Sequence, residues 1–513
     1  MILVAMLAVP LLGALGMLVP LPGSPRRVTR LARLYGLAVS GLTLVLSVAA
    51  AVAFHYGRRG PQLGVNVTWA GSIGLRFHLG VDGISLPLVV LTAALTFLCM
   101  VYTARVLPAP AGSRGGSPQS LIGLVLLLEV GMLGTFVALD LLLFFVFFEV
   151  VLIPMYFVIA DWGGSGGKDA GTRARAAANK FILYTLLGSG FLLVGILIVA
   201  VNAGTLDMTA LAARHGAGLS HGLQVAAFGL LALGFAVKTP MWPLHTWLPD
   251  AHTEAPTVGS VLLAGVLLKM GTYGFVRIAV PMAPDGAKFW APWLGFLAVI
   301  GIVYGALACL AQRDLKRMIA YSSIGHMGFV LLGIATLTPV GLNAALFGNI
   351  AHGLITGLLF FIAGAVKERY ATGDLDALGG GMLAKAPYLA SILTFASVAS
   401  LGLPGLAGFW GEMLALLGAY QPHAGLPRET FVTFMAAGGI GAVLTAAYFL
   451  RMLSKVTHGP VAERWRDTRF ADVMPHELLA WTPLITATLF IGLWPKTLLA
   501  LTDGAVRLLL GGR

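Results

Sequence analysis

Ionisable side chains stand inside long apolar segments of this chain, where bulk water cannot solvate them. Glu149 lies in LLLFFVFFEVVLIP, Lys269 in SVLLAGVLLKMGTYG, and Lys238 two residues before a proline. A carboxylate or ammonium at a bilayer centre costs about 2.5–3.5 kcal/mol on the insertion scale. Since a folded protein has a net stability of only about 5–15 kcal/mol, these groups must pair, face internal water, or both. The candidates are Glu149, Lys238, Lys269, His326, His352 and Glu412, with Glu129 and Asp140 as auxiliary acids.

The mixture of acids, lysines and histidines favours proton transfer over cation binding. A buried lysine beside a movable carboxylate can change protonation state near neutral pH, and histidine titrates in that range unaided. A sodium or metal site would instead use clustered carboxylates and carbonyls. The alternative for one buried charge is an ion pair that joins two helices. The alternative for His326 and His352 is a packing role, with Tyr321, Ser322 and Ser323 as possible partners of His326.

The elements that must position these residues are membrane helices. Of 513 residues, 58% are hydrophobic and 11% are charged, about half the charged share of a soluble domain. Apolar runs that can cross a ~30 Å hydrocarbon layer recur along nearly the whole sequence. We expect an all-α polytopic membrane protein with about fourteen spans by window hydropathy. They lie near 1–20, 32–54, 80–103, 120–138, 140–160, 178–202, 222–248, 257–280, 289–311, 316–336, 341–366, 387–417, 430–453 and 476–497.

Lysine and arginine gather in alternate loops, which explains the net charge of +12 without a nucleic-acid partner. The positive-inside rule then places both termini outside. The first apolar stretch lacks a preceding basic region, so we expect a retained helix and not a signal peptide. The loops with most basic residues are 26–33, 105–114 (with Arg114), 168–180 (with Lys168), 313–317, 367–385 and 451–469.

Two expected spans contain proline within the apolar run, at Pro240 with Pro243 and at Pro404 among glycines. Proline removes a backbone donor and breaks or kinks a helix. The two spans are the seventh and the twelfth, so a five-helix repeat would be inverted, and paired broken helices indicate a transport pathway. The alternative is two merely kinked helices. We expect four units: helices one to three at 1–119, repeats at 120–280 and 281–455, and a loop with the last helix at 456–513.

No energy-converting motif accompanies these residues. Cys99 and Cys309 lie far apart in apolar spans, without the spacing of a cluster or zinc site. The stretch from Gly163 to Gly171 lacks the spacing of a phosphate loop, and no dinucleotide fingerprint is present. We therefore expect no cofactor and no metal in this chain, and energy that arrives from partner subunits or from another ion's gradient.

Four motifs carry a family resemblance, which is strong from about 120 to 455. They are FFEVVLIPMYFVIADWGG, KTPMWPLHTWLPDAHTEAPTVGSVLLAGVLLKMGTYG, LKRMIAYSSIGHMGF and GLPGLAGFWGEM. Together they resemble the antiporter-like subunits of respiratory complex I. The first three are shared with Mrp-type antiporters and membrane-bound hydrogenases. Glu412, where the L and N subunits typically have lysine, and an end soon after the last span favour the M-type branch. Gly325 departs from the small hydroxyl residue often found there.

The resemblance implies a role for each candidate. Glu149 and Lys238 would form the carboxylate–lysine pair of the inner half-channel, and Lys269 the central relay. His326 and His352 would extend the wire, and Glu412 would be the terminal group at the outer half-channel. Glu129 would lie at the inter-subunit face and Asp140 at the channel edge.

The resemblance also implies a setting. The chain would translocate protons as part of NADH–quinone oxidoreductase, without redox catalysis of its own. Its rich use of alanine, glycine and arginine separately indicates a bacterium with a GC-rich genome, which would place the chain in the plasma membrane. FMN, iron–sulfur clusters and quinone would belong to partner subunits. Its partners would be the neighbouring antiporter-like subunits L and N, lipid, protons and internal water. The alternatives are an Mrp-type or hydrogenase-type subunit and a structural membrane scaffold.

Overall fold

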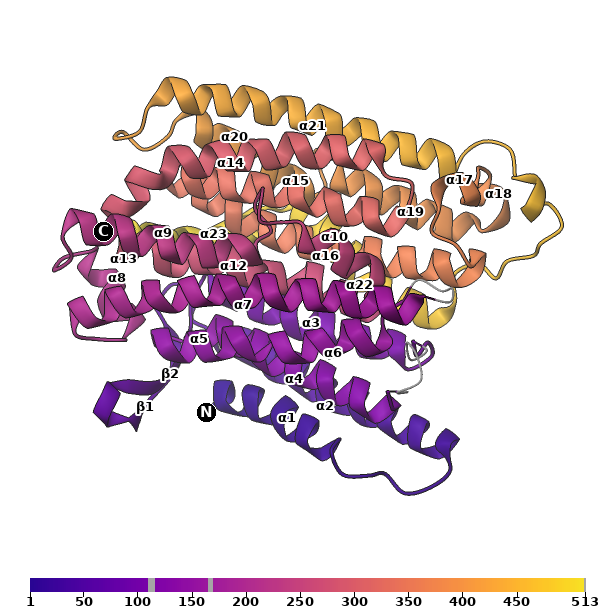
Figure 1. Ribbon diagram of the computed structural model, residues 1–513, viewed down its shortest axis with the longest axis horizontal. Helices are drawn as coiled ribbons and strands as arrows, with labels where there is room; N and C mark the ends of the chain where they lie inside the picture. Colours follow the sequence, from indigo (N-terminus) through magenta and orange to yellow (C-terminus); the bar gives the residue numbers. More distant parts are fainter. Residues whose placement is uncertain (109–115, 165–168, 512–513) are drawn as a thin grey trace.

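The computed structural model describes residues 1–108, 116–164 and 169–511. Arg114, Lys168 and part of the Gly163–Gly171 stretch, which the sequence analysis discussed, lie outside these residues. Helices run along the long axis of the molecule (Figure 1). The β1–β2 hairpin and both termini lie at one end, at the left of the view, and short helices α17 and α18 lie at the other. We call these the hairpin end and the basic end, since Lys316, Lys367 and Lys385 belong to the latter.

The first half of the chain forms two peripheral helices, the hairpin and the helices that carry Glu149 and Lys238. The elements are α1 (Ile2–Gly16), α2 (Pro25–Ala53), β1 (Gln62–Ala70), the 3₁₀ turn η1 (Gly71–Ile73), β2 (Leu75–Val81), α3 (Ser85–Thr103), α4 (Pro118–Val137), α5 (Leu141–Val150), α6 (Leu152–Trp162), α7 (Ala170–Ala203), α8 (Met208–Arg214), α9 (His221–Lys238) and α10 (Trp247–Glu254).

The second half begins with one span of changing helix type and ends with a surface helix. The elements are α11 (Thr257–Leu262), the π-helix η2 (Leu263–Leu267), α12 (Leu268–Gly274), the π-helix η3 (Phe275–Ala279), α13 (Val280–Met282), α14 (Pro284–Ala311), α15 (Leu315–Ala335), α16 (Pro339–Tyr370), α17 (Leu375–Leu378), α18 (Met382–Lys385), α19 (Pro387–Ser400), α20 (Ala407–Tyr420), α21 (Arg428–Val456), η4 (Glu463–Trp465), α22 (Pro475–Leu493) and α23 (Lys496–Leu509).

The helical, polytopic fold class is confirmed. In the described residues, 12 helices are long and apolar enough to cross a membrane, and α1 and α19 are shorter apolar helices. Each expected span coincides with one of these helices or with a helix pair, although the number of crossings stays a prediction. The least exposed spans are central: Thr257–Met282 is 100% buried over its apolar window and Pro339–Tyr370 is 94% buried, against 28% for Pro25–Ala53. These two central spans carry Lys269 and His352.

The hairpin is an exception to the all-α prediction. β1 pairs antiparallel with β2, with Val67 opposite Phe77. Its sequence alternates polar and apolar residues with period two, the pattern of a half-buried strand. His78 on β2 ties the hairpin to the bundle, since its Nδ1 lies 3.1 Å from Oδ2 of Asp207 before α8.

Both proline-containing spans are interrupted. α9 ends at Lys238 and α10 begins at Trp247, with Pro240 and Pro243 between them. α19 ends at Ser400 and α20 begins at Ala407, with Pro404 between them. A third interruption separates α5 from α6 directly after Glu149 and was not predicted. Pro154 explains it, because this residue has no N–H for the carbonyl of Val150, where α5 ends.

A backbone pairing recurs at opposite ends of the bundle. Near the hairpin end, Leu141 N–H donates to Leu206 O (2.9 Å) and Met208 N–H to Leu139 O (2.8 Å). The same two bonds recur at the basic end, where Leu315 N–H donates to Gly373 O (2.8 Å) and Leu375 N–H donates to Arg313 O (2.6 Å). The central aspartates of these bridges each cap a following helix: Asp140, Asp207, Asp314 and Asp374.

Candidate functional site

Four of the predicted residues meet in one row that crosses the middle of the bundle. Lys269 Nζ lies 2.6 Å from His352 Nδ1. The His352 and His326 rings are 5.6 Å apart between centroids, and His326 Nε2 lies 3.7 Å from Oε1 of Glu412. The row therefore joins α12, α16, α15 and α20, which are far apart in sequence.

Local helix geometry holds Lys269 in this row. The π-helices η2 and η3 flank α12, and π-helical turns inside α-helices are frequent at functional sites. Besides His352, Lys269 Nζ donates to the carbonyl of Ala264 on η2 at 2.5 Å. Lys269 is completely buried, so these two acceptors replace water around its ammonium.

The His352 imidazole can pass a proton from one nitrogen to the other. Its Nδ1 faces the donor Lys269, so Nδ1 accepts and the neutral ring carries its hydrogen on Nε2. His352 Nε2 has no hydrogen-bond partner among the described residues. A proton that Nδ1 takes up is thus balanced by one that Nε2 releases.

His326 has a partner for its Nε2 atom in either protonation state. Its Nδ1 donates to Ser322 O at 2.7 Å, so that nitrogen keeps its hydrogen. The other nitrogen, Nε2, lies 3.0 Å from Ser400 O and 3.2 Å from Ser400 Oγ. A neutral ring accepts from the hydroxyl, and a protonated ring donates to the carbonyl. Of the three predicted partners, Ser322 contacts His326, and it does so through its backbone carbonyl.

The break after α19 places Glu412. Gly402 has φ +73° and Gly405 has φ +91°, the left-handed region that favours glycine. A Cβ atom at Gly402 would lie 2.6 Å from Oε2 of Glu412. The glycine therefore supplies both the backbone turn and the space for the carboxylate.

A small cavity connects the histidines to Glu412. Its volume is about 20 Å³, counted as the space open to the centre of a water molecule, and a cavity needs roughly 10–15 Å³ on this measure to hold one water. His326, His352, Thr356, Ser400 and Glu412 line it. Polar partners and volume together allow a bridging water in the row.

Glu149 and Lys238 form a second, neighbouring cluster. Ser189 on α7 donates to Oε1 of Glu149. Lys238 Nζ stands over the Phe148 ring, 4.5 Å from its centroid, and has no hydrogen-bond partner among the described residues. Glu149 and Lys238 interact electrostatically, without an N–O contact within 4.0 Å in the described part of the chain. The two side chains are therefore near enough to interact, but their charged atoms are not in contact.

The two clusters adjoin through the end of α9. A Cβ at Gly271, two residues beyond Lys269, would lie 2.4 Å from Thr239 Oγ1 and 2.7 Å from Phe235 O. The glycine thus lets α9 and α12 approach closely, directly beside Lys238. One residue further along α12, Thr272 donates a hydrogen bond to Asn349 Oδ1 at 2.9 Å and so joins α12 to α16.

The two auxiliary acids do not join either cluster. Asp140 accepts from the backbone N–H groups of Leu142 and Leu143 (3.0 and 3.1 Å) and of Arg76 (3.2 Å), as a helix cap. Glu129 is completely buried, and neither of its carboxylate oxygens has a hydrogen-bond partner among the described residues.

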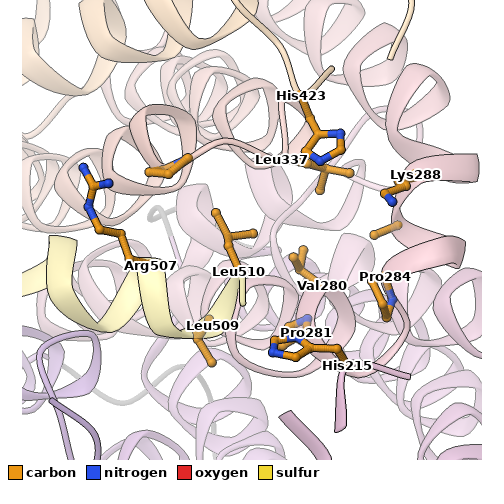
Figure 2. Close-up of a pocket in the computed structure, with 12 residues that line it drawn as sticks. His215, Val280, Pro281, Pro284, Lys288, Leu337, His423, Arg507, Leu509 and Leu510 are labelled. Atoms are coloured by element: carbon orange, nitrogen blue, oxygen red, sulfur yellow. The ribbon is translucent and has the colours of Figure 1, made fainter. Parts of the chain in front are cut away.

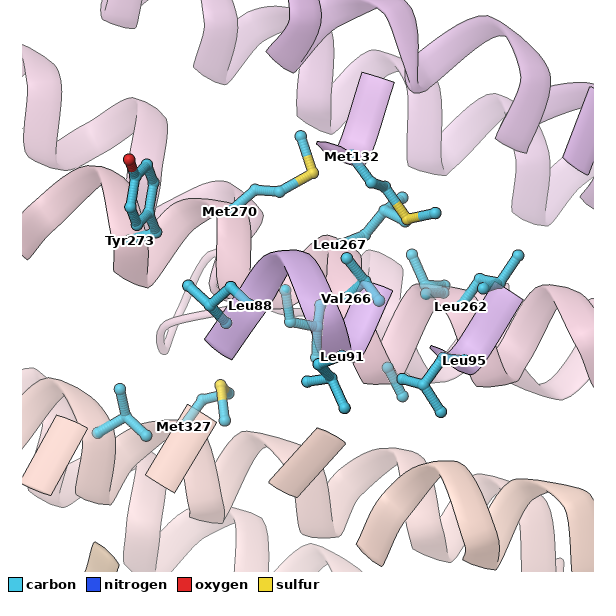
Figure 3. Close-up of a cluster of buried hydrophobic side chains, with 14 of the residues drawn as sticks. Leu88, Leu91, Leu95, Met132, Leu262, Val266, Leu267, Met270, Tyr273 and Met327 are labelled. Carbon is cyan, nitrogen blue, oxygen red and sulfur yellow. The ribbon is translucent and has the colours of Figure 1, made fainter. Parts of the chain in front are cut away.

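Apolar side chains enclose the central row. Figure 3 shows Leu88, Leu91 and Leu95 of α3 beside Val266 and Leu267, with Met132 and Met270 near one another on another side of the cluster. This packing excludes water except where polar side chains admit it, and electrostatic interactions are stronger in such surroundings.

A separate hollow of 430 Å³ lies at the hairpin end and contains none of the predicted site residues. His215, Lys288, His423 and Arg507 line it, and the apolar Val280 and Leu510 lie between them in the view (Figure 2). No group of three or more histidines, cysteines or acids with metal-binding geometry occurs in the described part of the chain.

Comparison with known proteins decides the family. Residues 138–445 match the family described as NADH:quinone oxidoreductase/Mrp antiporter, TM. The chain belongs to this family. NADH-quinone oxidoreductase subunit M of Rickettsia prowazekii (strain Madrid E) is 38% identical over 460 residues, which cover 90% of this chain and 89% of that protein. The expected resemblance is therefore confirmed.

Solved structures extend the comparison from residues 138–445 to nearly the whole chain. A chain of respiratory complex I from Thermus thermophilus superposes with TM-score 0.84 at 30% identity, covering 100% of both chains. A chain of the Mrp complex from Dietzia sp. DQ12-45-1b gives TM-score 0.81 at 23% identity over 98% of this chain and 96% of that one. The second likeness shows the shared fold alone.

Three residues that complete the contact row and the Glu149–Lys238 cluster were not predicted from the sequence. Ser189 and Ser400 touch Glu149 and His326, and Ala264 contributes only its carbonyl. A serine within an apolar span is a usable signal, because its hydroxyl needs a partner there. No side-chain signal marks Ala264.

Proposed function

We propose that this chain is a proton-conducting, M-type membrane subunit of an NADH–quinone oxidoreductase. The observation that carries the proposal is the contact row from Lys269 through His352 and His326 to Glu412. The family and the relatives named subunit M support the same assignment. Quinone reduction in partner subunits drives the movement of protons, and this chain performs no redox step.

The Glu149–Lys238 pair receives protons in this proposal. A charge that changes in a neighbouring subunit alters the separation of Glu149 and Lys238, and thereby the proton affinity of the lysine. The open geometry of the pair supports this role, because Lys238 rests on Phe148 and has no hydrogen bond to break among the described residues when it approaches the carboxylate. Lys269 then takes the proton across the α9–α12 contact.

The row carries the proton onward. Lys269 gives a proton to His352 Nδ1, and His352 Nε2 releases one towards His326. His326 Nε2 passes it to Glu412, directly or through one water in the adjoining cavity. His352 returns to its starting tautomer by ring rotation, whereas His326 receives and gives the proton at Nε2 and keeps its tautomer, so charge and hydrogen balance at every step.

The remaining features follow from the same assignment. The chain lies in a bacterial plasma membrane with its hairpin end and both termini outside. Its units are 1–119, 120–280, 281–455 and 456–513; the recurring backbone bridge at opposite ends supports the two inverted repeats. Neighbouring subunits L and N are its partners. FMN, iron–sulfur clusters and quinone lie in other subunits, and the residues of this chain supply only proton carriers.

The test is the number of protons pumped per electron by the assembled, reconstituted complex. Lys238→Ala should lower this ratio, because the inner half-channel loses its proton carrier. Lys288→Ala, an exposed lysine on α14 outside both clusters, is the matched control and should leave the ratio unchanged. A Lys238→Ala complex that pumps as many protons per electron as the parent would overturn the proposal.

An Mrp-type exchanger is the second candidate, because the description of the matched family also names the Mrp antiporter. An exchanger moves sodium against protons in liposomes without NADH or quinone. The proposed subunit moves neither sodium nor protons under those conditions. Measuring sodium-driven pH change in such liposomes separates the two functions.

A further inference from the structure

His252 is a buried imidazole that the pathway above does not use. It lies on α10, the short helix after the first break, and is 0% exposed. Its ring stacks on Phe360 of α16 with centroids 4.4 Å apart and planes at 11°. Neither ring nitrogen has a hydrogen-bond partner among the described residues.

Such a ring needs polar partners. An imidazole carries at least one N–H donor, and in its neutral form one acceptor. A buried polar group without a partner costs about 1–3 kcal/mol, so native proteins satisfy these groups with protein atoms or internal water. Stacking on Phe360 occupies only the ring face of His252. Its edge nitrogens have no partner among the described residues and are left to bind internal water.

His252 lies between the basic end and the central row. Phe360 and His352 are eight residues apart on α16, which is about 12 Å along the helix axis, with Phe360 nearer the basic end. Thr356 lies halfway between them and lines the cavity of the row. Towards the basic end, Lys316 Nζ donates to the carbonyl of Ala255, three residues beyond His252.

Charged and titratable groups surround the His252 ring on several elements. Lys316 of α15 and Lys269 of α12 both act on it electrostatically, and His252 in turn acts on His352 of α16. Glu254, on the same helix as His252, pairs with Arg173 of α7 at 3.4 Å. His252 is thus a titratable group that lies between the Lys316 region and the Lys269–His352 pair.

We infer that His252 is a second proton inlet, which reloads the Lys269–His352 pair from the basic end. It takes up a proton at one ring nitrogen from water near Lys316. It releases one from the other nitrogen, through water beside Thr356, to the pair. The inference rests on the proposed function, since it assumes that Lys269 and His352 conduct protons.

The experiment compares His252→Phe and His252→Ala in the assembled, reconstituted complex. Phenylalanine keeps the stack on Phe360 but carries no proton. Loss of a positioned proton carrier slows the transfer that it serves by about 10²–10⁴-fold, so we expect fewer protons pumped per electron in both variants. Added imidazole should restore pumping in His252→Ala alone, because only that variant has space for it. His221→Ala, an exposed histidine at the start of α9, is the control.

Each outcome supports or overturns the inference. A lowered ratio in His252→Phe with rescue of His252→Ala by imidazole supports the inlet. A full ratio in His252→Phe, or loss in His252→Ala that imidazole does not restore, shows a packing role and overturns it. Lys269→Ala, which removes a carrier that both inlets feed, is measured alongside. If that variant pumps normally, the proposed function fails; if it is impaired while both His252 variants pump normally, only the inlet fails.

Discussion

Nζ of Lys269 and Nδ1 of His352 lie 2.6 Å apart at the centre of the bundle, although 83 residues separate them in sequence. Both side chains are on the least exposed helices of the fold. Their contact connects Lys269, which lies beside the Glu149–Lys238 cluster, with the part of the row that runs through His352 and His326 to Glu412.

Replacing His352 should interrupt the row. In His352→Ala, Lys269 keeps only the Ala264 carbonyl as a hydrogen-bond partner among the described residues, and the proton has no imidazole to enter. Proton transfer through the row should slow by about 10²-fold or more. Pumping per electron in reconstituted complex checks this expectation, with His458→Ala at the basic end as the control. Equal ratios in the two variants would show that protons avoid His352.

Gly402→Ala should reduce stability and displace Glu412. An alanine at φ +73° costs about 1–2 kcal/mol, and its Cβ would press on the carboxylate oxygen of Glu412. Gly190→Ala on α7 is the control, because its Cβ meets nothing within 4 Å. The thermal midpoint of the purified complex should fall for Gly402→Ala and stay level or rise for Gly190→Ala. The same midpoint in both variants would refute the proposed strain.

Asp82→Asn should destabilise the hairpin side of the bundle. Arg277 on η3 donates to Oδ1 of Asp82 at 2.5 Å, and both side chains are nearly buried. Removing one partner of such a pair lowers the free energy of unfolding by about 3–5 kcal/mol, because the other charge stays buried without a partner. Asp376→Asn removes the exposed partner of Lys455 and should produce no measurable loss. Chemical denaturation of both variants checks the difference; similar losses would contradict it.

Acid should release the hairpin from the bundle. Burial raises the pKa of Asp207, but the nearby His78 and hydrogen bonds from Thr209 and Ala210 outweigh it and lower that pKa overall. A carboxyl with a depressed pKa stabilises the fold above its ordinary value of about 3.9, and that contribution disappears as the pH falls through the folded-state pKa.

Proteolysis of the hairpin as a function of pH measures this effect. The parent chain should become susceptible only well below pH 4, whereas Asp207→Asn should be susceptible already at pH 7 and respond little to acid. Asp285→Asn, at the same end but on α14, is the control. Resistance of Asp207→Asn at neutral pH would mean that the His78 contact does not hold the hairpin.

The sequence predicted the spans and the buried ionisable residues because lipid imposes strict composition on exposed helices. Pro240 and Pro404 also lie within interruptions of their helices. Proline acts through its own backbone, so its effect is local and readable. The same reasoning missed Pro154, whose effect on Val150 separates α5 from α6 at Glu149.

The contacts within the site were beyond sequence reasoning. Which nitrogen of His352 faces Lys269 depends on the packing of α12 against α16, and the π-helices around Lys269 leave no periodic signature. The helix-cap role of Asp140 was likewise not predicted: three backbone N–H groups donate to its carboxylate, and its place at a channel edge stays a prediction. The β1–β2 hairpin was readable from its alternation but was passed over because the surrounding chain is so strongly helical.

The central claim is that protons travel through the contact row, and Lys269→Ala tests it most directly. The measurement is the number of protons pumped per electron by the reconstituted complex during NADH oxidation, with Lys288→Ala as the matched control. The account predicts that Lys269→Ala lowers this ratio while Lys288→Ala retains the parent value. An unchanged ratio in an assembled Lys269→Ala complex would contradict it.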